Sequence, residues 1–193
     1  PHKFDCHALC ATHSPRADFL GAVNTIRRNA DSSWHGDMFD GLGYVKAIES
    51  KGFSLQNKKG LLVGAGGAGS AIAHAMVLAG VSELAIHDEN TERRESLIQR
   101  LNSLNLGKVK VGSDNPSGCD VAINATPMGM REGDPSPIDI HAITPNMFIG
   151  CVITAPAVTP LIAAARAKGC NTSTGADMFV QVRELMVQFL LDQ

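Results

Sequence analysis

Several features that would place this chain in a common class are missing from its sequence. Its five cysteines include no Cys-x-x-Cys pair, its charges form no basic run around a formal net charge of −2, and its apolar runs are short. No cleavable leader is visible. These absences argue against a disulfide framework, a nucleic-acid partner and a membrane partner, and favour a small-molecule substrate and a cytoplasmic location.

What the sequence does have is enough apolar residues for a core. Its 193 residues are 44% hydrophobic, which suits one full domain and part of a second. Thiols and imidazoles gather in the first thirteen residues, where Cys6, Cys10 and His13 have the spacing of one helix face. Because no later pair supplies further ligands, we expect no metal here and predict that Cys6, Leu9 and Cys10 face the core.

A glycine-rich segment in the middle of the chain predicts a nucleotide site. The pattern indicates a buried strand at Gly60–Val63, a turn, and a helix that stops at Gly80. The turn fits G-x-G-x-x-G, in which the glycines permit a tight turn, close approach of a pyrophosphate and close packing of the helix on the strand. The predicted cofactor contacts in this turn are Gly64, Gly66, Gly67, Ala68 and Gly69.

An acidic residue about 20 positions later bears on which dinucleotide binds. The stretch "ELAIHD" predicts a second strand ending at Asp88, where a carboxylate accepts hydrogen bonds from the ribose hydroxyls of NAD and repels the 2′-phosphate of NADP. With Glu89 beside it, NAD is favoured. Two alternatives stay open: Asp88 or Asn90 only caps the following helix, or Arg93 and Arg94 reach a phosphate, so that NADP binds.

The rest of the chain continues to alternate strands with helices. The segments "VKVG", "DVAIN" and "MFIGCVIT" predict strands, and "TPLIAAARAKG" predicts a helix with Thr159 at the N-cap, Pro160 at N1 and Gly169 after its end. This alternation predicts an α/β fold, a Rossmann-type doubly wound parallel sheet. The loop "NATPMGM" follows a strand and should border the cofactor, unless it is an ordinary proline turn. Its predicted cofactor contacts are Asn124, Ala125, Thr126 and Met130.

The segment before the glycine turn follows a different pattern. "GAVNTI" predicts a short strand that carries Asn24 and Thr25, and Asp40 begins a predicted helix closed by Gly52. From the residues alone, Asp40 is as well explained by helix capping as by catalysis.

Taken together, these motifs resemble one family. "PHK", "GAVNTI", the glycines after Asp40, "GAGGAGSAIA", "NATPMGM" and the proline-containing "TPL" segment occur in the order found in shikimate dehydrogenases and their quinate dehydrogenase-like relatives. The resemblance spans nearly the whole chain. It implies reversible hydride transfer between a nicotinamide cofactor and a ring hydroxyl of shikimate, quinate or a related hydroxy acid.

The resemblance also assigns roles to individual residues. It implies that Lys3 is the catalytic acid and base, that Asp40 orients it, and that Asn24, with Thr25 beside it, binds substrate hydroxyls. Met178, at the start of the last helix, would approach the nicotinamide. Gln181 is a candidate substrate contact because the family's glutamine aligns one position later.

Three departures from the family pattern bear on the substrate. Met38 and Phe39 replace an Asn-Thr pair, Thr154 replaces a tyrosine, and Val182 replaces the substrate-binding glutamine, which puts the substrate in doubt. At the cofactor site, Glu89 replaces the family's arginine for the 2′-phosphate, which agrees with the argument for NAD.

The family carries a substrate domain ahead of "PHK", and this chain starts at that motif. The expected organisation is a remnant of the substrate domain in residues 1–50, an NAD(P)-binding domain in 51–175 and a returning helix in 176–193. We expect the remnant to be ordered through swapping, docking or a homodimer. The final helix has a predicted apolar face that would favour self-association, formed by Phe179, Val182, Leu185, Met186 and Phe189.

The leading hypothesis is therefore an NAD-preferring dehydrogenase of the shikimate or quinate type. An alternative is a catalytically silent dinucleotide-binding or regulatory module of the same fold. A fold like that of glutamyl-tRNA reductase or a folate dehydrogenase does not account for "PHK" followed by "GAVNTI".

Overall fold

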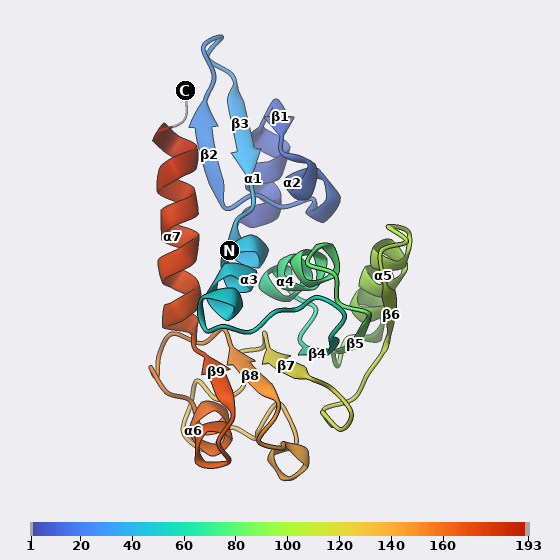
Figure 1. The fold of residues 1–193 in the computed structure, drawn as a ribbon. Coiled ribbons are helices and arrows are strands. Elements are labelled where there is room, and N and C mark those ends of the chain that lie inside the picture. Colours follow the sequence, from blue (N-terminus) through green and yellow to red (C-terminus); the bar gives the residue numbers. More distant parts are fainter. Residues whose placement is uncertain (1, 192–193) are drawn as a thin grey trace.

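A parallel sheet forms the centre of the molecule, which we describe from a computed structural model over residues 2–191 (Figure 1). Its six strands in this range lie in the order β6-β5-β4-β7-β8-β9, so that the chain starts in the middle and winds outward in both directions. The predicted Rossmann-type doubly wound sheet is confirmed. The strands are β4 (Lys59–Val63), β5 (Glu83–His87), β6 (Lys108–Val111), β7 (Val121–Asn124), β8 (Phe148–Cys151) and β9 (Asn171–Ser173).

Alternation of side chains along each strand divides the core between the two faces of this sheet. Leu62 of β4 packs in one apolar cluster, whereas its neighbours Leu61 and Val63 pack in another. The strands therefore read as continuous apolar runs, as expected where helices cover both faces.

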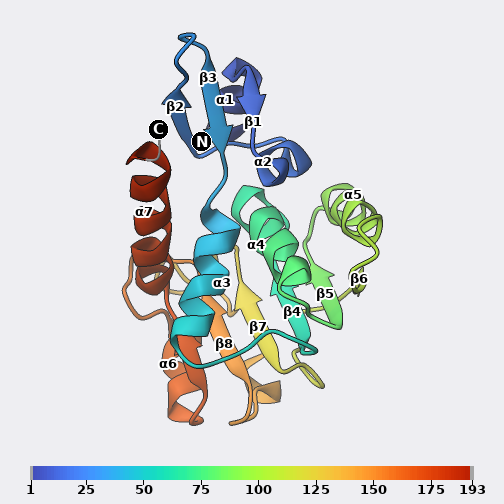
Figure 2. The same cartoon turned by 45° about the horizontal axis from the view of Figure 1, so that its top comes forward.

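Helices cover each of the two faces. The first is covered by α3 (Asp40–Ser50), α4 (Gly67–Leu78) and α5 (Thr91–Asn102), and the second by α6 (Pro160–Ala167) and the short 3-10 helix η1 (Ile140–Ala142) (Figure 2). Helix ends follow the predicted signals. Thr159 caps α6 by accepting from the backbone N–H of Ile162, while Gly80 and Gly169 take positive φ angles just after α4 and α6.

A second, three-stranded sheet lies at the other end of the molecule (Figure 1). Its central strand β3 (Trp34–Asp37) pairs in parallel with β1 (Thr12–His13) and antiparallel with β2 (Thr25–Arg28). Two short helices, α1 (Lys3–Leu9) and α2 (Pro15–Leu20), pack beside it around a small cluster that includes Cys10 and Leu20.

The last helix, α7 (Gly175–Leu191), runs from the large sheet to the small one and packs against α3 and β2 (Figures 1 and 2). The prediction that one face of this helix is apolar and packed is only partly correct, because Val182 is buried against Gly43 of α3 but Phe179 is 60% exposed. Self-association through this helix stays a prediction. No helix among residues 2–191 has the length and apolar character needed to cross a bilayer.

Two local predictions near the N-terminus were wrong. The stripe of Cys6, Leu9 and Cys10 is not a buried face, since Leu9 is 73% exposed while Cys10 is buried. The strand expected over "GAVNTI" begins only at Thr25, because Gly21 ends α2 with a positive φ and the next three residues form the connection. The proposed division at residues 50 and 175 stays a prediction; α3, from the first segment, packs closely on α4 of the second.

Candidate active site

Lys3, Asp40 and Asn24 meet in one hydrogen-bonded group. The ammonium of Lys3 donates to Oδ2 of Asp40, and Nδ2 of Asn24 donates to Oδ1 of the same carboxylate at 2.7 Å. The Asp40 side chain is 12% exposed and that of Lys3 is 29% exposed. A buried carboxylate is thus paired with a cation that solvent can still reach, an arrangement suited to passing a proton to a small molecule.

Asp40 lies at the first residue of α3, but it does not cap that helix. The N-cap is Phe39, which makes no side-chain capping bond, and both Asp40 oxygens are used by Lys3 and Asn24. The structure therefore contradicts the capping alternative. The helix N-terminus stabilises the negative charge of the carboxylate at this position.

Further hydrogen bonds hold Asn24 and the start of α1 in place. Oδ1 of Asn24 accepts from the backbone N–H of Phe39 at 3.1 Å and from the hydroxyl of Thr25 at 3.2 Å. The backbone carbonyl of Lys3 accepts from the N–H of Val23 at 2.9 Å, so that the start of α1 is tied to the same connection. Thr25 itself is buried and positions Asn24.

Lys3 lies beside the glycine-rich turn. A Cβ built on Gly67 would come within 3.9 Å of Cδ of Lys3, whereas one on Gly66 would meet nothing within 4 Å. There is therefore open space beside Gly66, where a dinucleotide phosphate would approach, and the side chain of Lys3 passes close to Gly67.

The other two glycines of the turn have the predicted geometry. Gly64 takes a φ of 104°, which only glycine adopts easily, and a Cβ on Gly69 would overlap the carbonyl oxygen of Gly64. These residues thus fit the roles of tight turn and close packing. The turn has the shape required to hold a dinucleotide.

Asp88 follows β5 and is buried beside the same turn. Its carboxylate accepts from the N–H groups of Ala65 at 2.6 Å and Asn90 at 2.8 Å, and from Nη2 of Arg93 at 2.7 Å. Burial raises the pKa of Asp88, but the hydrogen bonds from Arg93 and from the two backbone groups outweigh it, and the net pKa lies below the ordinary value. The carboxylate is thus held ionised.

The same contacts bear on the alternatives to a cofactor role for Asp88. Asn90 is the N-cap of α5 and accepts from the N–H of Arg93, so Asp88 is not needed for capping. Arg93 pairs with Asp88, and Arg94 pairs with Glu95 at 2.9 Å. Glu89 is exposed at the rim.

Two cavities adjoin this edge of the sheet. One of about 370 Å³ is lined by Asp88, Glu89 and Thr126, and one of about 230 Å³ by Gly66 and Ser70 among others. The larger cavity lies beyond the carboxyl ends of β4, β5 and β7, where doubly wound sheets bind ligands, and the smaller one lies beside the turn that follows β4.

The loop after β7 is organised by a buried asparagine. Oδ1 of Asn124 accepts from the N–H and the hydroxyl of Thr126 at 2.9 and 2.7 Å, and its Nδ2 donates to the carbonyl of Met128 at 3.1 Å. Asn124 therefore shapes the loop, while Thr126 lines the cavity. Ala125 contacts Gly64, and Met130 is 52% exposed at the loop tip.

The chain is 34% identical over 186 residues to the shikimate dehydrogenase (NADP(+)) of Rubrobacter xylanophilus, an alignment that covers 93% of this chain and 65% of that protein. The solved quinate dehydrogenase from Corynebacterium glutamicum, in complex with NAD, is 31% identical with a TM-score of 0.86, and 98% of this chain matches 70% of it. The chain belongs to the shikimate and quinate dehydrogenase family.

The chain also resembles a reductase of another substrate, and it matches only part of the length of its relatives. The ligand-free 5-ketofructose reductase of Gluconobacter sp. strain CHM43 is 27% identical with a TM-score of 0.90, and all of this chain matches 71% of it. No protein-family model matches the chain. The chain spans slightly less than two thirds of the length of the first curated relative, and it corresponds to the C-terminal part of such proteins.

At the two positions before Asp40, where the resemblance predicts an Asn-Thr pair, the chain has residues that enter the core. Met38 is 1% exposed and Phe39 is 3% exposed. Phe39 packs edge-on against Phe189 of α7, with the ring centroids 5.4 Å apart. Val182 is likewise buried, and Gln181 beside it is half-buried. These positions contribute packing where polar contacts are expected in the family. Met178 packs against the main core cluster.

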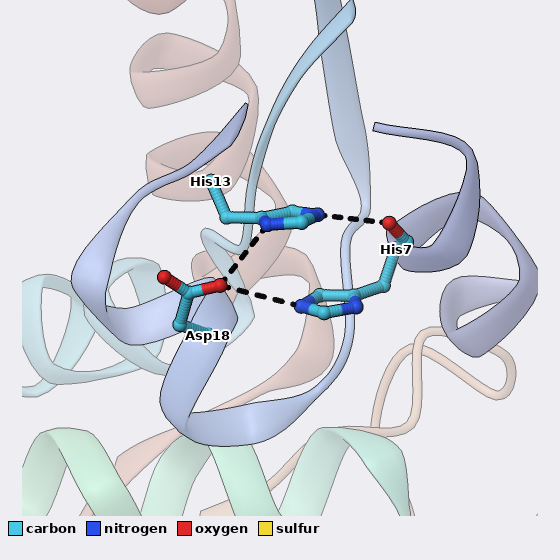
Figure 3. Close-up of side chains that lie close together, drawn as sticks. All are labelled: His7, His13 and Asp18. Atoms are coloured by element: carbon cyan, nitrogen blue, oxygen red, sulfur yellow. Dashed lines mark hydrogen bonds and ion pairs between the residues drawn. The ribbon is translucent and has the colours of Figure 1, made fainter. Parts of the chain in front are cut away.

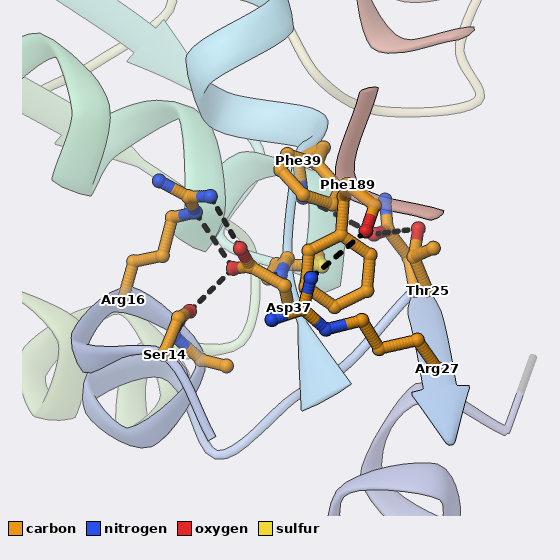
Figure 4. Close-up of polar contacts among 10 residues, drawn as sticks. Ser14, Arg16, Thr25, Arg27, Asp37, Phe39 and Phe189 are labelled. Carbon is orange, nitrogen blue, oxygen red and sulfur yellow. Dashed lines mark hydrogen bonds and ion pairs between the residues drawn. The ribbon is translucent and has the colours of Figure 1, made fainter. Parts of the chain in front are cut away.

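A partly buried ion pair near the site was missed from the sequence (Figure 4). The carboxylate of Asp37 accepts from Nε of Arg16 at 2.7 Å, from Nη2 of the same residue, from the hydroxyl of Ser14 and from the N–H of Met38. This network joins α2 to the end of β3, three residues before Asp40. Nothing in the local sequence signals it, because the partners come together only through the small sheet.

Two residues of α5 that line the smaller cavity, Ser96 and Arg100, were also missed from the sequence, whereas Arg93 was already a candidate phosphate contact. Arg93, Ser96 and Arg100 recur at helical spacing and form one face beside Gly66. Of the two guanidinium groups on that face, the one of Arg93 is paired with Asp88 and the one of Arg100 lies over the ring of Phe19.

Proposed function

We propose that this chain supplies the cofactor site and the catalytic lysine of an NAD(P)-dependent dehydrogenase that acts on a ring hydroxyl of shikimate, quinate or a related hydroxy acid. The observation that carries the proposal is the Lys3, Asp40 and Asn24 group beside the open glycine turn. The family of the chain supports the reaction class.

In this proposal the side chains of the protein donate and accept the proton, and a bound nicotinamide would supply or accept the hydride. As a ring ketone is reduced, its oxygen gains negative charge, and the ammonium of Lys3 stabilises that charge and donates the proton. Asp40 holds the ammonium in position. In the direction of oxidation the amine takes the proton from the hydroxyl. Asn24 gives one N–H to Asp40, which leaves the second N–H of its amide for a substrate hydroxyl.

The main test is turnover by the whole chain. We expect reduced nicotinamide to form from NAD with shikimate or quinate, and the Lys3→Ala variant to lose at least about 100-fold in rate, as removal of a general acid or base does. Lys108→Ala is the matched control, because that side chain is 70% exposed on β6. Equal rates in Lys3→Ala and wild type would overturn the role of Lys3.

We further propose that NAD is preferred over NADP. The support is the ionised carboxylate of Asp88 at the cavity beside the turn, with Glu89 at its rim. Asp88→Asn keeps an acceptor for the ribose but removes the charge that repels a phosphate, so the ratio of NAD to NADP affinity should fall about tenfold or more. Calorimetric titration with both cofactors measures that ratio. An equal loss for both cofactors would show that Asp88 only supports the turn, which refutes the preference.

A second candidate function is a dinucleotide-binding module without turnover. It is favoured by the burial of Met38, Phe39 and Val182 where the family carries polar side chains. This module would bind NAD with the same dependence on Gly66 yet give no product with either acid. Extending the chain at its N-terminus by the segment that relatives possess then separates a silent module from an incomplete enzyme, because only the enzyme gains turnover.

A further inference from the structure

Contrary to the expectation from the sequence that this segment holds no metal, we propose that His7, His13 and Asp18 form a binding site for a divalent transition-metal ion such as Zn²⁺. The three side chains come from α1, β1 and α2, and their ligand atoms all lie within 4.8 Å of one another (Figure 3). In the part of the chain that the structure describes, no other group of three or more such residues has this proximity. Imidazole nitrogens with a carboxylate oxygen are a ligand set that Zn²⁺ prefers.

The separations between the ligand atoms suit one shared ion. Oδ1 of Asp18 lies 3.0 Å from Nδ1 of His13 and 3.6 Å from Nε2 of His7. In a tetrahedral zinc site with metal–ligand bonds of about 2.0–2.2 Å, neighbouring ligand atoms are about 3.3–3.6 Å apart. Both observed distances are close to this range.

The hydrogen bond on the far side of His13 selects the tautomer that a metal needs. Nε2 of His13 lies 2.8 Å from the backbone carbonyl oxygen of His7, and a carbonyl can only accept, so that nitrogen carries the proton. In the neutral ring, Nδ1 then presents a lone pair toward the carboxylate of Asp18. A backbone carbonyl that orients a ligand imidazole in this way is the usual outer contact of a metal-binding histidine.

A lone pair facing a carboxylate oxygen at 3.0 Å requires a cation between the two acceptors. The candidates are a proton on His13 or a metal ion shared by the three groups. His7 favours the metal, because its Nε2 is buried, has no hydrogen-bond partner among the described residues, and lies toward the same oxygen. A proton on His13 would satisfy one imidazole and leave the other unexplained, whereas an ion uses both.

Binding also predicts a specific movement. The two rings now stack with centroids 3.9 Å apart and planes 7° apart. Because the lone pair of a ring nitrogen lies in the ring plane, the His7 ring must turn out of the stack to point at the shared ion. His7 lies in the last turn of α1, and its side chain is 24% exposed.

The site would fasten the helix that carries Lys3. His7 lies one turn after Lys3 on α1, and α1 and α2 are only seven and six residues long, too short to be stable alone. An ion held by α1, β1 and α2 closes these short elements on one another. This role is independent of substrate, so it can be tested without turnover.

The test is Zn²⁺ titration of the whole untagged chain after treatment with EDTA. We expect calorimetry to give one ion per chain, with affinity at least about tenfold weaker in His13→Gln and in Asp18→Asn. Zn²⁺ should also raise the midpoint of thermal unfolding of the wild type and not of these variants. His2→Gln is the matched control, since His2 pairs with Asp5 on the same helix and should bind Zn²⁺ as the wild type does.

Two results would overturn the proposal. The first is Zn²⁺ affinity that is the same in wild type, His13→Gln and Asp18→Asn, which would place any bound ion elsewhere. The second is thermal stability that depends on pH through His13 and Asp18 but does not respond to Zn²⁺, which would show that a proton occupies the position.

Discussion

Replacing Tyr44 by phenylalanine should stabilise the protein. The ring of Tyr44 is fully buried in the main core, and its hydroxyl has no hydrogen-bond partner among the described residues. Burial, with the nearby Cys151 and Asp177, raises the pKa of Tyr44 well above its ordinary value, so the group stays a neutral donor. A buried donor without a partner is one of the costlier features of a core.

The expected gain follows from two opposing contributions. An unsatisfied buried polar group costs about 1–3 kcal/mol. Removing one oxygen leaves a void of at most about 15 Å³, which costs about 0.4 kcal/mol at ~24 cal/mol per Å³. The net gain in the free energy of unfolding for Tyr44→Phe is therefore about 0.6–2.6 kcal/mol, or about 1–10 °C in the unfolding midpoint for a chain of this size.

Thermal and chemical unfolding of wild type and Tyr44→Phe measure this gain. Gly150→Ala provides an internal check, because a Cβ at that position would overlap the Tyr44 hydroxyl. The substitution should be markedly less damaging in the Tyr44→Phe background than in the wild type. An unchanged or lower midpoint for Tyr44→Phe would refute the reasoning and would show that a buried water pairs with the hydroxyl.

Three other sets of substitutions test the fold around the site. Gly69→Ala should destabilise the chain by about 1–3 kcal/mol or more through overlap with the glycine turn, whereas Gly66→Ala, with open space around it, should keep the unfolding midpoint and weaken NAD binding in calorimetry. Burial and, to a smaller extent, the charges of Arg100 and Arg16 lower the pKa of His74 below 6.5, so between the two pKa values the unfolded chain binds a proton that the folded chain does not. The free energy of unfolding should therefore fall as the pH drops from 6.5 toward the pKa of the folded state, and His74→Gln should flatten that part of a plot of stability against pH. Arg16→Leu should cost about 1.5–3 kcal/mol in denaturant unfolding, because Asp37 loses its opposite charge while Ser14 and Met38 still donate hydrogen bonds to it. Adding Asp37→Asn should recover most of the loss; equal stability of wild type and Arg16→Leu would show that the pair contributes nothing.

The sequence was most informative where the backbone itself limits which residue fits. Gly64 and Gly69 could be assigned because a positive φ and a close carbonyl each exclude a side chain. The caps of α6 were equally predictable, since Thr159 and Gly169 act within one turn of the helix. In each case the signal and the structure lie within a few residues of each other.

Sequence spacing failed where three or more elements converge. Helical spacing grouped Cys6 and Cys10 with His13, yet His13 lies on a strand and stacks on His7. Leu9, at the end of α1, is exposed for a related reason: a seven-residue helix can bury only a narrow face. Which side that face takes depends on β1 and α2, and local periodicity does not contain that information.

The position of Asp40 explains how the parts of this molecule combine into one site. β3 ends at Asp37 and α3 begins at Asp40, so the carboxylate lies at the junction between the small sheet and the helix that packs on the cofactor-binding region. Lys3 reaches it from α1, beside the small sheet, and also comes close to Gly67 at the start of α4. In the proposed mechanism, the distance between the proton donor Lys3 and the cofactor depends on the packing of α3 against α4 and α7, so the buried Met38, Phe39 and Val182 would affect that distance as well as stability.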